Sequence, residues 1–186
     1  LASLTKPLAT ALGTLCLVSQ GIVRLDDSLA KLLSSTTVPE DKKEISLRQL
    51  LSHCSGLPAW KPYYLSLSTL PHIARKAHIR RQILEEPLAY PPATNTIYSD
   101  LGYIVIQWLL EEISGQDLYH FTRNNLFDHF NCGALGFIPL AQETGFEPNQ
   151  FADTEYCSWR DRIVCGEVHD ENAYALGGVA GHAGLF

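Results

Sequence analysis

Ser3 and Lys6 are the residues of this chain whose types and spacing most directly suggest chemistry. They stand three apart in Ser3-Leu4-Thr5-Lys6, at the start of a long apolar stretch. In a helix, this spacing places both side chains on one face. An amine beside a hydroxyl can take up its proton and turn a weak nucleophile into an attacking one. The pair therefore suggests a serine nucleophile with a lysine as its partner.

The spacing alone does not identify the nucleophile, because a second serine–lysine pair has the same spacing. Ser28-Leu29-Ala30-Lys31 has the same pattern, but we expect Ser28 on the polar surface of a short helix. For Ser3, the alternative is a serine that caps a helix, with a solvated lysine one turn on. Two later motifs favour the first pair: residues 98–100, Tyr-Ser-Asp, and residues 182–184, His-Ala-Gly.

The three motifs, in this order, resemble those of the serine β-lactamase and penicillin-binding-protein superfamily. That family uses S-x-x-K, then Y-x-N, then K-T-G or H-x-G. The similarity is greatest to its class C-like branch, with D-Ala-D-Ala carboxypeptidases and family VIII esterases. Residues 50–58, LLSHCSGLP, resemble a further family segment, and residues 166–186 resemble a subgroup of penicillin-binding-protein-like hydrolases. The resemblance covers nearly the whole chain.

The resemblance implies a serine hydrolase that cleaves an amide or ester through an acyl-enzyme. In it, Ser3 attacks the carbonyl, Lys6 lowers the cost of deprotonating Ser3, and Tyr98 hands the proton to the leaving group. The backbone N–H of Leu185 would join that of Ser3 as an oxyanion hole. The resemblance implies no cofactor, a small molecule or peptidoglycan-derived peptide as substrate, and a place in the cell envelope or periplasm.

Three positions shape substrate binding in this reading. Asp100 stands where the family usually has Asn, and a carboxylate cannot donate a hydrogen bond as an amide does. It would either pair with Lys6 and hold it charged, or cap the helix that follows. His182 stands where many relatives have Lys and keeps a donor there. Gly184, without a side chain, lets the strand approach the substrate closely.

Other polar residues have simpler explanations. The run from His169 to Glu171 looks like a set of metal ligands, but adjacent residues rarely converge on one ion. We expect no metal site and interpret Asp170 as a helix N-cap. His53 is expected to tie its own turn to neighbouring backbone rather than to catalyse. We expect the five cysteines to be free, mostly buried thiols; Cys157 and Cys165 are the one pair close enough in sequence to suspect of a disulfide.

The composition of the chain argues against several classes of function. The chain has 186 residues, of which 46% are hydrophobic and 18% charged, as in a globular protein. A formal net charge of −6 argues against binding to a nucleic-acid backbone. No apolar run is long enough to span a bilayer. Because the chain lacks Met and begins two residues before Ser3, we expect an incomplete domain with further strands beyond both ends.

The expected fold is α+β, of the DD-peptidase and class C β-lactamase type. Residues 1–186 would form one incomplete domain, with a helical region at about 3–130, a loop-rich segment at about 131–170 and a return to the sheet at about 177–186. Within it we expect helices at 4–20, 46–52, 73–86, 100–113, 118–130 and 172–176. The functional alternatives are a family VIII-like carboxylesterase and a catalytically silent relative that binds cell-wall peptides.

Overall fold

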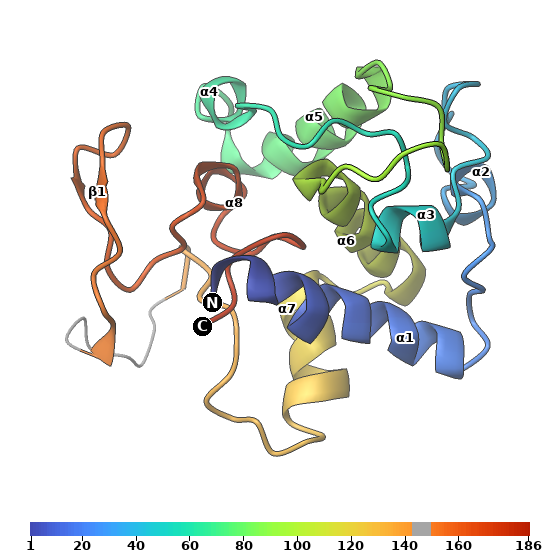
Figure 1. The fold of residues 1–186 in the computed structure, drawn as a ribbon. Helices are drawn as coiled ribbons and strands as arrows, with labels where there is room; N and C mark the ends of the chain where they lie inside the picture. Colours follow the sequence, from blue (N-terminus) through green and yellow to red (C-terminus); the bar gives the residue numbers. More distant parts are fainter. Residues whose placement is uncertain (143–149) are drawn as a thin grey trace.

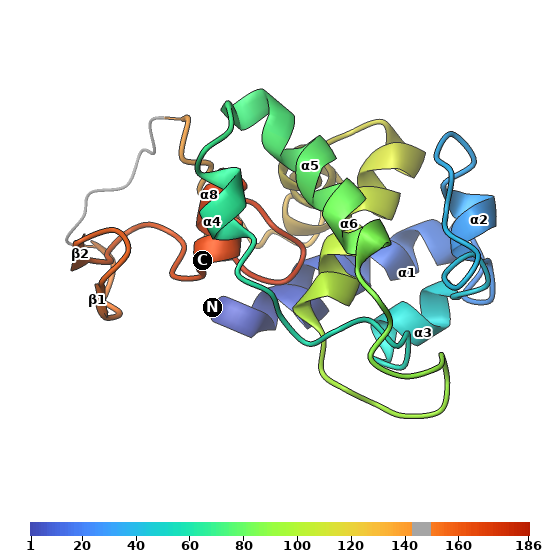
Figure 2. The ribbon, with the colours of Figure 1, turned by 90° about the horizontal axis from the view of Figure 1, so that it is seen from above.

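One buried helix forms the centre of the computed structural model, which describes residues 1–142 and 150–186. This helix, α6 (Asp100–Ser114), is buried at every position from Leu101 to Leu110. Its sequence there is apolar on nearly all sides, which is the pattern of a helix enclosed by other elements. Helices α3 (Leu47–Leu51) and α5 (His72–Glu85) pack against it, as Figures 1 and 2 show.

Local signals fix both ends of α6. The Ser99 hydroxyl caps the first turn by accepting a hydrogen bond from the Gly102 N–H at 3.1 Å. Gly115, with a φ of 68°, ends the helix in the left-handed conformation that glycine adopts without strain. The sequence predicted this helix to within one residue. Its start therefore holds Asp100, and the Tyr98 that precedes it, at the edge of the core.

The N-terminal helix is continuous but not uniform. It begins as the 3₁₀ turn η1 (Ala2–Leu4), continues as the π-helical η2 (Lys6–Ala11) and becomes the regular helix α1 (Leu12–Ser19). The predicted helix at 4–20 is therefore present. One face of it is open to solvent, where three leucines are 42–54% exposed: Leu4, Leu12 and Leu15. The opposite side packs on α6 and α7 (Leu118–Thr122), and Thr10 there donates a hydrogen bond to the Gly181 carbonyl at 2.6 Å.

The remaining helices are short. They are α2 (Leu29–Leu32), α4 (Tyr64–Leu67), the π-helical η3 (Arg123–Phe127) and α8 (Glu171–Ala175). Ser46 caps α3 through a reciprocal bond with Gln49, as its sequence predicted. The predicted helix at 118–130 instead comprises α7 and η3, which ends at Phe127. Helix α4 packs on α8 and joins the C-terminal region to the helical layer.

The sheet content is small. Strand β1 (Tyr156–Cys157) pairs antiparallel with β2 (Arg162–Ile163), and this hairpin projects to one side of the helices in Figures 1 and 2. In the predicted return to the sheet at 177–186, the described residues form one isolated antiparallel bridge, from Leu185 to Phe137. A single bridge offers no row of backbone hydrogen bonds along which a strand could extend. Of the predicted loop-rich segment, residues 143–149 lie outside the described residues.

The two termini lie side by side (Figure 1), and the Leu1 ammonium donates a hydrogen bond to the Leu185 carbonyl at 2.9 Å. This closeness brings the motif at the start of the chain to the motif at its end. One cluster of buried apolar residues, from Ala9 to Leu185, underlies both. In the part of the chain that the structure describes, no helix has both the length and the apolar character needed to cross a membrane.

Candidate active site

The Lys6 ammonium lies at the centre of the candidate site. Its Nζ donates to Ser3 Oγ at 3.0 Å and to the His182 carbonyl at 3.0 Å, and it lies 2.6 Å from an Asp100 carboxylate oxygen. Three acceptors thus match the three N–H donors of an ammonium. Lys6 is 2% exposed, whereas Ser3 is open to solvent. The prediction that the spacing puts both side chains on one face is confirmed.

The second serine–lysine pair is engaged elsewhere. Lys31 Nζ lies 2.5 Å from an Asp27 carboxylate oxygen, and no described contact joins it to the Ser28 hydroxyl. Ser28 is the N-cap residue of α2 and bridges to Ser46. The structure therefore leaves Ser28 near the surface and away from the other two motifs, as we expected.

Tyr98 reaches the site through its ring rather than its hydroxyl. Lys6 Nζ lies 4.7 Å from the ring centroid, within the range of a cation–π contact. Within residues 1–142 and 150–186, the Tyr98 hydroxyl has no hydrogen-bond partner, and the side chain is 52% exposed. Tyr98 thus contacts Lys6 through its ring, and in the described part of the chain its hydroxyl makes no hydrogen bond along the predicted proton path.

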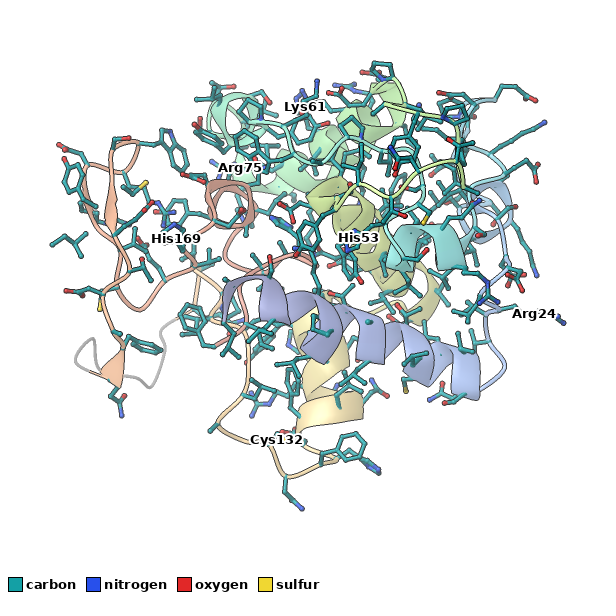
Figure 3. All side chains as sticks on the ribbon, in the orientation of Figure 1. Arg24, His53, Lys61, Arg75, Cys132 and His169 are labelled. Carbon is teal, nitrogen blue, oxygen red and sulfur yellow. The ribbon has the colours of Figure 1, made fainter. Side chains whose placement is uncertain are left out.

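His53 holds the segment that carries Tyr98. Its Nδ1 accepts a hydrogen bond from the Ser99 N–H at 3.0 Å, and its ring lies 4.5 Å from that of Tyr98. Burial and the nearby charge of Lys6 lower the pKa of His53 below its usual range, so that Nδ1 is free to accept. The prediction of a structural role for His53 is confirmed. Figure 3 shows it between the N-terminal helix and the helices above.

Asp100 is an ion-pair partner and not a cap. The structure decides between the two roles left open by the sequence, because Ser99 caps α6 while Asp100 lies 2.6 Å from Lys6 Nζ. The Asp100 side chain is 20% exposed and that of Lys6 3%. Little water screens a pair this enclosed, so its attraction is stronger than that of a surface ion pair. The structure therefore makes Asp100 the ion-pair partner of Lys6.

The ring of His182 is held by Asp170, a contact that sequence reasoning missed. His182 Nε2 lies 2.9 Å from Asp170 Oδ1, which also accepts from the Ala173 N–H at 2.7 Å. The predicted N-cap role of Asp170 is thus confirmed, but it is only half of what the side chain does. Burial alone would raise the pKa of Asp170; the charge of His182, its hydrogen bond and the Ala173 N–H together lower it to about 2.

The Leu185 amide has a different partner from the predicted one. Its N–H donates to Thr5 Oγ1 at 3.0 Å, and Thr5 in turn donates to the Ala2 carbonyl at 2.6 Å. Thr5 is fully buried and stands one residue before Lys6, so it ties the chain end to the nucleophile helix. The Leu185 amide is therefore paired within the chain in this structure, and its role as an oxyanion donor stays a prediction. A threonine between the motif residues carried no sequence signal for this contact.

Gly184 is needed for a close approach within the chain. Its φ is +116°, and a Cβ there would lie 2.5 Å from the Gly178 carbonyl oxygen. Only glycine adopts this conformation without strain and leaves room for that backbone. The structure shows Gly184 allowing a close approach between two glycine-rich segments of the chain. The close approach to a substrate stays a prediction.

A cavity of about 630 Å³ opens beside Ser3. Four carboxylates line it: Asp100, Glu167, Asp170 and Glu171. Its basic side chains are His169, 3.1 Å from Glu155, and His182 beside its own aspartate. Among the residues that the structure describes, no three His, Cys, Asp or Glu side chains gather closely enough to hold a metal ion. The site can therefore combine a serine hydroxyl, an ammonium and an open cavity with carboxylates in its lining.

Comparisons with known proteins agree with this arrangement. A family model described as Beta-lactamase matches residues 1–159. A curated Escherichia coli O157:H7 protein named "Putative D-alanyl-D-alanine carboxypeptidase" is 34% identical over 205 aligned residues, which cover 100% of this chain and 46% of that protein. A Bacillus subtilis protein named N-acetylmuramyl-L-alanine amidase is 32% identical, with the same coverage. This chain thus spans about half the length of the curated relatives it matches.

Solved structures extend the similarity. The penicillin binding protein of Bacillus halodurans superposes with a TM-score of 0.71 at 20% identity, over 99% of this chain and 54% of that one. The Yersinia pestis beta-lactamase/D-alanine carboxypeptidase complexed with citrate gives 0.67 at 26% identity, over 100% and 48%. The expected fold is confirmed as helix-rich with a small sheet, matching part of that architecture. The chain belongs to the β-lactamase family.

Proposed function

We propose that this member of the β-lactamase family carries the nucleophile of a serine hydrolase, and that substrate acyl groups are transferred to Ser3. The observation that supports this most strongly is the 3.0 Å contact between Lys6 Nζ and Ser3 Oγ, on a buried lysine that three motifs surround. The family is a serine hydrolase family, and the relatives bear the names of peptide and amide hydrolases.

In the proposed reaction, Ser3 Oγ bonds to the carbonyl carbon while its proton passes to Lys6 in its neutral form. Collapse of the tetrahedral intermediate breaks the bond to the leaving group, which takes that proton by way of the Tyr98 hydroxyl. Only a neutral Lys6 can accept this proton, so acylation requires that the ion pair of Lys6 and Asp100 first lose one proton. Water then hydrolyses the acyl-enzyme, and Ser3 regains its proton.

The proposed substrates are amides of peptidoglycan-derived peptides, with the D-Ala-D-Ala terminus as the first candidate. This choice rests on the names of the relatives, and the location we propose with it is the cell envelope or periplasm. Either an amide or an activated ester presents the carbonyl that the proposed mechanism needs.

A carboxylesterase is the second candidate, favoured by the charges of the cavity. Three of its four carboxylates lie beside basic side chains: Asp100 beside Lys6, Asp170 beside His182, and Glu167 beside Arg160 and Arg162. The fourth, Glu171, has no ion-pair partner among the described residues. A free peptide carboxylate near Glu171 would meet a like charge, whereas an uncharged ester would not. Three test substrates therefore separate the two candidates: a D-Ala-D-Ala peptide, the C-terminal methyl ester of the same peptide, and a neutral aryl ester.

The test of the proposal is covalent labelling of the full-length protein by a fluorophosphonate and by a fluorescent penicillin. Ser3→Ala should abolish labelling, while the matched Ser28→Ala variant should keep the wild-type rate. A folded wild-type protein that takes neither label would instead identify the catalytically silent binding relative. Hydrolysis of the neutral ester alone would favour the carboxylesterase, and release of D-Ala would favour the peptidase.

A further inference from the structure

We propose that Asp170 is a positioning residue of this site: its carboxylate holds the His182 ring, and through the His182 backbone it fixes the carbonyl that orients Lys6 toward Ser3. The inference rests on the proposed function of Ser3 and Lys6. It adds a residue outside the three motifs, on α8, to the machinery of acyl transfer.

The first support is the isolation of the His182 ring. The residue is 1% exposed, and its Nε2 has the Asp170 carboxylate at 2.9 Å. Its other nitrogen, Nδ1, is buried and has no hydrogen-bond partner among the described residues. Without the carboxylate, both ring nitrogens would be buried and unpaired, which is a costly state for polar groups. Asp170 is therefore what keeps this ring in its orientation.

The second support is the contact that His182 makes with its backbone. Its carbonyl accepts from Lys6 Nζ at 3.0 Å, and this bond is buried. The ammonium has two other acceptors, Ser3 Oγ and Asp100, so the His182 carbonyl fixes the third direction. A shift of this carbonyl would let the ammonium turn away from the serine hydroxyl.

The third support is the rigidity of the element that carries Asp170. Its Oδ1 also caps α8 through the Ala173 N–H. The next residue but one, Asn172, is fully buried, accepts from the Tyr64 N–H at 2.8 Å and donates to the Lys61 carbonyl at 2.9 Å. Asp170 is thus anchored through α8 to the segment around α4, and it lines the same cavity as Ser3.

The test separates the charge of Asp170 from its cap. Asp170→Asn keeps a capping side chain of the same size, but it removes the charge from the bond to His182. A charge-assisted bond is about tenfold more favourable than a neutral one in equilibrium terms. We expect kcat for an activated ester to fall about tenfold while KM changes less than about twofold. Asp170→Glu, which retains the charge, should recover part of the lost kcat.

The matched control is Asp117→Asn. Asp117 also caps a helix, α7, through the His120 N–H, and its carboxylate lies 2.9 Å from His120 Nδ1, but on the exposed surface. This variant should keep the wild-type kcat. Melting transitions of all variants establish that they are folded.

The outcomes are distinguishable. Wild-type protein that is not labelled at Ser3 overturns the proposed function, and this inference with it. Labelled wild type with unchanged kcat in Asp170→Asn overturns the positioning role alone. A change confined to KM would contradict it too, since it would show a substrate contact. If Asp170→Asn does not fold, Asp170→Glu decides: a folded Glu variant with kcat more than tenfold below wild type overturns the role.

Discussion

Replacing Asp100 by Asn is the most informative perturbation of the lysine environment. The two charges are 2.6 Å apart, and two unit charges at that distance attract by roughly 6 kcal/mol at an effective dielectric constant of about 20. Desolvation offsets much of this gross attraction, and removal of one partner from such a pair typically costs about 3 kcal/mol. We therefore expect Asp100→Asn to lower the free energy of unfolding by about 3 kcal/mol at pH 7.

The same change should leave the chemistry intact. Asn returns the amide that the family usually has here and removes the carboxylate that pairs with Lys6. We expect an acylation rate equal to or above wild type. Urea unfolding measures the first effect. Fluorophosphonate labelling between about pH 5 and pH 9 measures the second.

The control variant is Asp41→Asn. Lys42 is as enclosed as Lys6, at 3% side-chain exposure, but its partner Asp41 is 50% exposed. Solvent screening makes the loss smaller there, at most about 1 kcal/mol, and the labelling rate should not change. A loss of labelling by two orders of magnitude or more in folded Asp100→Asn would refute the reasoning, because it would make Asp100 an obligatory proton carrier.

Three further predictions concern stability. Gly181→Ala should lower the free energy of unfolding in urea by about 3 kcal/mol, because its Cβ would lie 2.3 Å from a backbone oxygen. Its control, Gly133→Ala, has open space around the new Cβ and should lower it by less than about 1 kcal/mol. Ser99→Ala should cost about 1 kcal/mol through loss of a cap, and Ser28→Ala, which makes no side-chain cap bond, less than about 0.5. The pKa of Asp170 is lowered from 3.8 to about 2, so its ionised form stabilises the fold above pH 4; acid titration should remove about 2 kcal/mol between pH 4 and pH 2 in wild type but not in Asp170→Asn.

Local signals in the sequence were enough to predict helix α6 and the contact between Ser3 and Lys6. A hydroxyl at the N-cap and a glycine at the C-cap bound α6 closely, because both act on the helix within one turn. Helical spacing together with the two later motifs predicted the Ser3–Lys6 contact, whereas the same spacing in Ser28 and Lys31 gives no such contact. The π-helical start of that helix was not predictable, since Lys6-Pro7-Leu8 reads as an ordinary first turn in which a proline is tolerated.

Long-range contacts of the site were out of reach of local reasoning. The position of Asp170 before a helix already explains it as a cap. Nothing in the residue spacing indicated that the same carboxylate also binds His182. The Leu185 amide was assigned by the position of its motif, whereas a buried threonine from the other end of the chain binds it. The role of Asp100 was open because a carboxylate can cap or pair, and only the three-dimensional position of Lys6 decides.

The most direct test of the central claim is to locate the covalent adduct. Full-length protein is trapped with a slowly hydrolysed activated ester, digested and mapped by mass spectrometry. The proposed mechanism predicts one acyl group, on the peptide that contains Ser3, and its loss in both Ser3→Ala and Lys6→Ala. An adduct on Ser28, or a rate of adduct formation that does not depend on Lys6, would contradict it.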